Sequence, residues 1–113
     1  MNDEVTLNRL SDNQLKFIIK DLNGSIIDPK YKWITIYIKC GDKIFKVIND
    51  PSGEETKYCH IENDYLIIDI PSKKLNKGFI EYMIETRNDD INFPDGFKNI
   101  FSLNYVKTKI QII

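Results

Sequence analysis

Alanine is absent from this chain of 113 residues, although isoleucine recurs along its whole length. Alanine is the strongest helix former, whereas isoleucine, tyrosine, phenylalanine, threonine and valine favour strands. The composition therefore favours β structure. The length is that of a single domain with a single core.

The sequence has neither an excess of basic charge nor a long apolar run. Lysine and arginine number 16 against 17 aspartates and glutamates, and no basic run exceeds Lys73-Lys74, whereas a nucleic-acid-binding protein normally carries a concentrated basic face. No stretch approaches the roughly 20 apolar residues of a membrane-spanning helix. The polar residues 1–14 resemble neither a signal nor a transit peptide. We therefore expect no nucleic-acid or membrane partner, and a protein that works where it is made or in an assembly built there.

Residues that could carry catalysis or bind a metal are scarce. The two cysteines, Cys40 and Cys59, are too few for a disulfide framework, and a structural zinc site needs four ligands in paired short spacings. Neighbours on a strand point to opposite faces, so Cys59 and the single histidine, His60, cannot act as a catalytic pair. Pairing Cys40 with His60 would leave the histidine without a third residue to orient it. We expect no catalytic residue, no metal and no cofactor here.

Acidic residues gather at Glu54-Glu55 and at Asp89, Asp90 and Asp95. Paired carboxylates can bind calcium or hydrolyse glycosides. The calcium-loop pattern with its final glutamate is absent, and adjacent acids in loops usually face solvent. We interpret both groups as solvent-facing loop residues.

Alternating apolar and polar residues predict the strands. In residues 33–39 the isoleucines at positions 34, 36 and 38 share one face, while Trp33 and Tyr37 lie on the other. Further strands are expected at residues 15–20, 43–48, 65–70, 78–86 and 104–112, with a short one at 57–61. Chain-reversing residues separate them, and Cys40-Gly41-Asp42 is short enough for a hairpin. The pattern predicts an all-β fold, an antiparallel immunoglobulin-like β-sandwich of about six to eight strands over residues 15–113. Residues 1–14 are expected to form a flexible or interface-forming arm.

Two connecting segments have apolar residues of their own. In residues 21–29, Asn-Gly reverses the chain, Ile26 and Ile27 are expected to close one end of the core, and Asp28-Pro29 stops further strand pairing. Residues 87–102 are expected to form a long loop held down by aromatic residues such as Phe93 and Phe97.

Apolar and aromatic residues also mark candidate interaction surfaces. Trp33, Tyr31, Tyr37 and Tyr105 lie on faces that are expected to point away from the core, where they could be covered by loops, contact another chain or stack on a sugar. The apolar C-terminus either completes a central strand or contacts another subunit. The candidate interface residues are Trp33, Tyr37, Tyr105, Leu7, Leu10, Ile112 and Ile113.

The order of the turns carries a resemblance to a known family over residues 15–112. Its elements are Asp-Leu-Asn-Gly at 21–24, the approach Ile68 to Leu75 with Gly78, and Asp-Ile-Asn-Phe-Pro-Asp-Gly at 90–96. This pattern resembles the small immunoglobulin-like domains of tailed-phage virion proteins. The likeness is to the N-terminal domain of baseplate upper proteins and to related domains of crAss-like and other Bacteroidetes phages.

The resemblance implies a non-enzymatic structural protein of the virion, made in the host cytoplasm. It would be an adaptor or fibre-base component of a head or tail appendage, and its partners would be capsid, portal, tail or fibre proteins and further copies of itself. Baseplate proteins continue into a fibre or receptor-binding region, whereas this sequence ends at Ile113, so we expect the module alone. The alternative is a carbohydrate- or protein-binding module, which requires Trp33 and Tyr37 to be exposed together.

Overall fold

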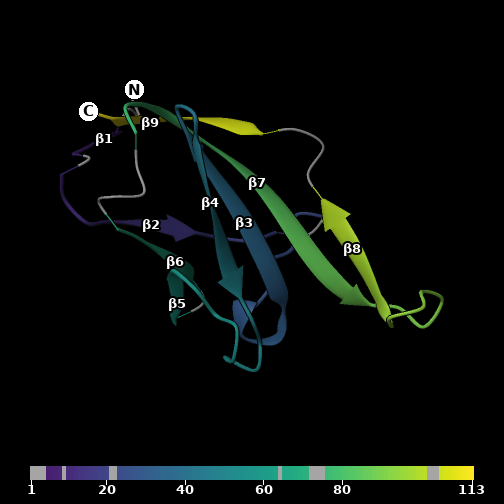
Figure 1. Ribbon diagram of the computed structural model, residues 1–113. Helices are drawn as coiled ribbons and strands as arrows, with labels where there is room; N and C mark the ends of the chain where they lie inside the picture. Colours follow the sequence, from purple (N-terminus) through teal and green to yellow (C-terminus); the bar gives the residue numbers. More distant parts are fainter. Residues whose placement is uncertain (1–4, 9, 21–22, 64, 72–75, 102–104) are drawn as a thin grey trace.

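The chain is a sandwich of two β-sheets in the computed structural model, which describes residues 5–8, 10–20, 23–63, 65–71, 76–101 and 105–113. The larger sheet has six strands in the order β1-β9-β7-β3-β4, with β8 beside β7, and the smaller has the order β2-β6-β5 (Figure 1). The strand bounds are β1 Val5–Leu7, β2 Asn13–Phe17, β3 Trp33–Cys40, β4 Lys43–Asn49, β5 Cys59–Glu62, β6 Tyr65–Ile70, β7 Gly78–Asp89, β8 Phe97–Phe101 and β9 Val106–Ile112. The predicted all-β sandwich is confirmed.

Strand β3 organises the larger sheet because it pairs antiparallel with both β4 and β7 over its whole length. The predicted hairpin joins β3 to β4 through Gly41, whose φ is 63°. A Cβ atom at this glycine would lie 3.1 Å from the backbone oxygen of Lys77, so the turn needs a residue without a side chain.

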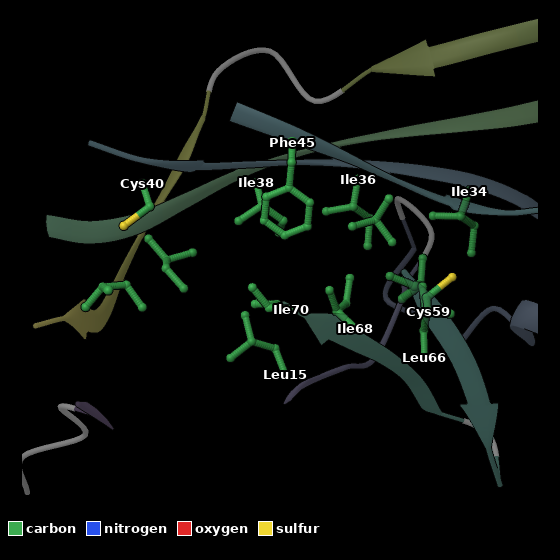
Figure 2. Packing of buried hydrophobic residues seen from close by; sticks show 14 residues of the cluster. Leu15, Ile34, Ile36, Ile38, Cys40, Phe45, Cys59, Leu66, Ile68 and Ile70 are labelled. Carbon is green, nitrogen blue, oxygen red and sulfur yellow. The ribbon is translucent and has the colours of Figure 1, made fainter. Parts of the chain in front are cut away.

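The core lies between the two sheets and is built mainly from isoleucine (Figure 2). Alternation along β3 turns Ile34, Ile36 and Ile38 inward, as the sequence predicts, and all three are fully buried. They face residues of the smaller sheet, among them Leu15, Leu66, Ile68 and Ile70. The two cysteines lie at the edges of the same cluster.

The segment 1–14 is in part a component of the sheets and not a separate arm. Strand β1 pairs in parallel with β9, and the backbone N–H of Ile113 donates to the oxygen of Leu7 over 2.9 Å. Leu7 also packs against the core, and β2 already begins at Asn13. Residues 1–4 and 9 lie outside the described residues.

The segment 21–29 reverses the chain as expected, but only one of its isoleucines reaches the core. Lys20 and Ile26 form a bridge, and the N–H of Ile27 donates to the oxygen of Ile19 over 2.8 Å. Because consecutive residues of an extended chain point to opposite sides, Ile27 packs on the core while Ile26 stays 61% exposed. Asp28 then caps the short 3-10 helix η1, Pro29–Tyr31. Residues 21 and 22 of the predicted turn lie outside the described residues.

The predicted long loop at 87–102 is wrong, because most of it forms a hairpin. Strand β7 runs on to Asp89, the chain turns at residues 90–96, and β8 returns along β7. Phe93 in the turn and Ile100 in β8 are exposed, whereas Phe97, the least exposed of the three at 37%, lies against Arg87 on the outer face of the sheet. Residue 102 lies outside the described residues.

Candidate functional site

A stack of two aromatic rings and one guanidinium lies on the outer face of the larger sheet. Register places Trp33 of β3 opposite Arg87 of β7, which in turn pairs with Asn99 in the middle of β8. The guanidinium carbon of Arg87 lies 4.3 Å from the centre of the Trp33 ring and 5.2 Å from that of Phe97. Such a cation–π pair contributes about 0.5–2 kcal/mol, depending on how dry it is. The stack fixes the base of the β7–β8 hairpin to the body of the sheet.

The other predicted aromatics of this face are also accompanied by charged side chains. The Tyr37 hydroxyl donates to Glu85 Oε1 over 3.4 Å, and Lys46 Nζ lies 5.9 Å from the Tyr37 ring centre. Desolvation, and then the negative charge of Glu85, raise the pKa of Tyr37. Lys39 Nζ lies 5.4 Å from the Tyr105 ring centre. Trp33, Tyr37 and Tyr105 are therefore half-buried members of an aromatic–ionic surface rather than a bare aromatic platform.

A cleft of about 470 Å³ opens beside the stack, lined by residues from η1, β3, β7 and β8 and from the turn that follows β4. Tyr31 forms its rim and is 81% exposed. The buried Asn49 positions this rim, because its Nδ2 donates to the backbone oxygens of Pro29 and Lys32 over 2.7 and 2.9 Å. The cleft thus combines an exposed aromatic ring with the guanidinium of Arg87.

Carboxylates line the same cleft. Asp50 and Asp89 contribute to its wall. Desolvation of Asp50 is outweighed by hydrogen bonds from the backbone amides of Ser52 and Glu55, which lower the pKa of this carboxyl. The cleft can therefore hold a ligand that offers hydroxyl or amine donors together with an apolar face.

The β7–β8 hairpin projects away from the smaller sheet, as Figure 1 shows. Every residue from 91 to 100 is exposed, and Ile91 at the tip is 97% exposed. Phe93, Phe97 and Ile100 add further apolar surface to the same hairpin. We call Ile91, Phe93, Phe97 and Ile100 the hairpin patch.

The acidic residues of this hairpin are accounted for by its turn. Asp90 Oδ1 accepts from the N–H of Asn92 over 3.0 Å, and Asp95 Oδ1 accepts from that of Phe97 over 3.2 Å. Aspartate side chains that bond the backbone two residues on are typical turn builders. The positions of Asp90 and Asp95 thus have a structural explanation.

The remaining candidate interface residues lie at the other end of the sandwich. Ile112 is 1% exposed and packs in the core. Of the two alternatives for the C-terminus, completing a strand is the one that applies to this residue. Leu7 is half-buried beside it, while Leu10 and Ile113 are exposed. Leu10 and Ile113 are the members of this group that leave most apolar surface in solvent.

Cys59 and His60 point to opposite faces of β5, as the sequence predicts. Cys59 is buried, and its Sγ donates to the backbone oxygen of Ile48 over 3.1 Å. Burial, and then the charge of Asp69, raise the pKa of the Cys59 thiol to about 11. On the outer side, His60 Nδ1 lies 2.6 Å from Asp69 Oδ2. A buried thiol with a raised pKa is a poor nucleophile at neutral pH.

Cys40 likewise lies in the core, and burial raises the pKa of its thiol. Among the residues that the structure describes, no three histidine, cysteine, aspartate or glutamate side chains gather where they could hold a metal ion. Over the same part of the chain, no helix has the length and apolar character needed to cross a membrane.

Sequence reasoning identified Trp33, Tyr31 and Tyr37, and it expected Phe97 to hold its own segment down, but it missed Arg87 and Asp50. Only the register of β3, β7 and β8 brings Arg87 and Phe97 to Trp33. Comparison of the chain with protein-family models, with curated proteins and with solved structures gives no match.

Proposed function

We propose that this chain is a non-enzymatic structural protein that acts by packing against other proteins, as an adaptor or fibre-base component of a virion. The observation that carries the packing role is the hairpin patch, an apolar surface on an element that projects from the sandwich. Several exposed apolar residues on one projecting element are typical of a site of protein contact, and here they are spread over both faces of the hairpin. The virion setting rests on the resemblance of the turn pattern to tailed-phage domains.

Charged residues surround the hairpin patch in the way that a polar rim surrounds an interface core. Asp89 and Lys98 are exposed on the same hairpin, and Arg87 lies at its base. At a protein interface the apolar centre supplies most of the binding energy, while the charged rim contributes little and fixes orientation. The partners proposed are capsid, portal, tail or fibre proteins and further copies of the chain.

The direct test is co-sedimentation with particles. Particles released from cells that produce this chain are banded on a density gradient, and the chain is quantified in the particle band by immunoblot. We expect the wild-type chain in the band, and loss of the Phe93→Ser/Ile100→Ser double variant from it. The control Phe79→Ser changes an equally exposed ring near the start of β7 and should leave the chain in the band. Absence of the wild-type chain from the particles would refute the virion role.

A second candidate function is a carbohydrate- or protein-binding module, favoured by the cleft beside Trp33. The exposed Tyr31 ring and the carboxylates of Asp50 and Asp89 offer stacking and hydrogen-bond acceptors to a sugar. Titration with a panel of oligosaccharides, followed by amide chemical shifts, tests this function. Binding that is lost in Tyr31→Ala and kept in Phe79→Ala would support it, and an unshifted spectrum with every sugar would exclude the carbohydrate form.

A further inference from the structure

Strand β8 lies at an edge of the larger sheet as far as the described residues go. Within the described residues it pairs only with β7, and all its residues up to Ile100 are exposed. The N–H of Asp90 donates to the oxygen of Gly96 over 2.9 Å, which makes this pair a hydrogen-bonded pair of the hairpin. Because such pairs alternate along an antiparallel ladder, Lys98 and Ile100 direct their backbone groups to β7. Residues 97, 99 and 101 direct theirs outward, and of these groups the N–H of Phe97 already donates to Asp95 Oδ1 over 3.2 Å.

The sequence of β8 is compatible with antiparallel pairing to β8 of a second copy of the chain. If two β8 strands run antiparallel around a two-fold axis at Asn99, residue 97 stands opposite residue 101 and Lys98 stands opposite Ile100. Asn99 then faces Asn99, and no charged residue faces another. The register also joins outward-directed backbone groups at each of the positions 97, 99 and 101. This allows about four hydrogen bonds across the axis, because the N–H of Phe97 already donates to Asp95 in each copy.

Strand β4, at the opposite edge of the larger sheet, is protected against the same pairing. Ile48 of β4 already exchanges two backbone hydrogen bonds with Lys57, over 3.1 and 2.8 Å. An antiparallel copy of β4 centred on its middle residue would place Lys46 opposite Lys46. Lysines and occupied backbone groups are the usual protection of an edge strand. Among the described residues β8 has no such bridge, and only the N–H of Phe97, at the start of the strand, is taken by a side chain. The one lysine of β8 would face an isoleucine.

We infer that β8 pairs with β8 of a second copy of this chain, forming a two-fold dimer with a sheet continuous across Asn99. This inference deepens the proposed function, on which it rests, by naming one partner and the surface that binds it. The pairing would place the two β8 strands side by side with the hairpin turns at opposite ends of the joint, and Ile100 of each copy against Lys98 of the other. Isologous pairing of this kind closes after two copies and leaves the outer edges of both sheets as they are.

The first test is the native mass of the full chain and of two variants at position 99. Asn99→Pro removes an outward-directed N–H and no hydrogen bond to β7, and proline is accepted on an edge strand when its nitrogen faces outward. Asn99→Ala keeps the backbone and is the matched control. By sedimentation equilibrium we expect a dimer for the wild type and for Asn99→Ala, and for Asn99→Pro a dissociation constant raised about tenfold or more. Circular dichroism spectra should coincide for all three proteins.

The second test reads the register by disulfide formation. In the proposed dimer residues 98 and 100 form a non-hydrogen-bonded pair, with Cα atoms about 4.5 Å apart, which suits a disulfide. Lys98→Cys/Ile100→Cys should therefore give a covalent dimer on mild oxidation. Each single variant should stay monomeric on a denaturing gel, since residue 98 lies about 7–8 Å from its own copy. The two natural cysteines are buried and do not compete.

Three outcomes would overturn the inference: a wild-type monomer at all concentrations, a dimer unaffected by Asn99→Pro, or equal cross-linking by the single and double cysteine variants. Failure here is distinguishable from failure of the proposed function. A chain that is monomeric yet bands with particles contradicts the β8 pairing alone. A dimer that is absent from particles contradicts the virion role alone.

Discussion

Replacing Ile36 with alanine tests the core directly. Ile36 lies at the middle of β3, opposite Val47 and Ile84, and its side chain is 0% exposed. Burial of an isoleucine side chain contributes about 1.5–3 kcal/mol to the free energy of unfolding. The cavity left by truncation adds to the loss, so that Ile36→Ala should cost about 2–5 kcal/mol. Domains of this size have a free energy of unfolding of about 5–15 kcal/mol, so the variant should still fold but be much less stable than the wild type.

The assay is urea unfolding followed by the fluorescence of the single tryptophan, Trp33. With a slope of about 2 kcal/mol per molar urea, a loss of about 3 kcal/mol moves the midpoint down by about 1.5 M. Ile36→Val should lower the free energy of unfolding by only about 0.5–1.5 kcal/mol. Ile44→Ala is the matched control, because Ile44 is 55% exposed on β4 and should change stability by about 0.5 kcal/mol at most. Equal losses for Ile36→Ala and Ile44→Ala would refute the assignment of inner and outer faces.

Three further predictions concern polar and titratable groups. The thiols of Cys40 and Cys59 should react with a thiol reagent at pH 8 only after unfolding, because both are buried and their pKa values are raised. Rapid reaction of the native protein would contradict this. The hydrogen bond to Asp69 raises the pKa of His60, so the pair stabilises the fold fully below the unfolded pKa of about 6.5 and loses this effect as the pH rises through the folded pKa. The urea midpoint of His60→Gln should therefore be closer to that of the wild type at pH 8.5 than at pH 5.5. A difference that does not change with pH would argue against the pair. Asn49→Ala leaves two backbone oxygens without their donor and should lower the free energy of unfolding by about 1–3 kcal/mol in urea melts; a neutral effect would show that water replaces the amide.

The sequence predicts β3 and β4 well because one face of each strand is covered by the core. Burial of alternate residues imposes a period of two that is readable without knowing the partner strand. The same reasoning fails at residues 87–101. Arg87 and Asn88 are polar, and they continue β7 only because they have partners elsewhere: Trp33 for Arg87, and Lys32, which donates to Asn88 Oδ1.

The candidate surfaces show the same limit. The aromatic residues of the outer face are visible in the sequence, but whether a ring is bare or covered depends on residues about fifty positions away. Ile26 and Ile27 look alike in the sequence, and the bridge between Lys20 and Ile26 decides which of them reaches the core. The position of β8 at an edge of the described sheet has no signal of its own in the sequence, because it depends on how the other strands are ordered.

Amide hydrogen exchange along β8 is the most direct measurement of the central claim, that the projecting hairpin is a contact surface between protein chains. Exchange is followed by NMR at a low and a high protein concentration, with the amides of Lys98 and Ile100 as internal references because they bond to β7. We predict that the outward-directed amide of Asn99 exchanges rapidly at low concentration and becomes protected at high concentration. Rapid exchange of the Asn99 amide at every concentration would contradict the pairing of β8 with a second copy.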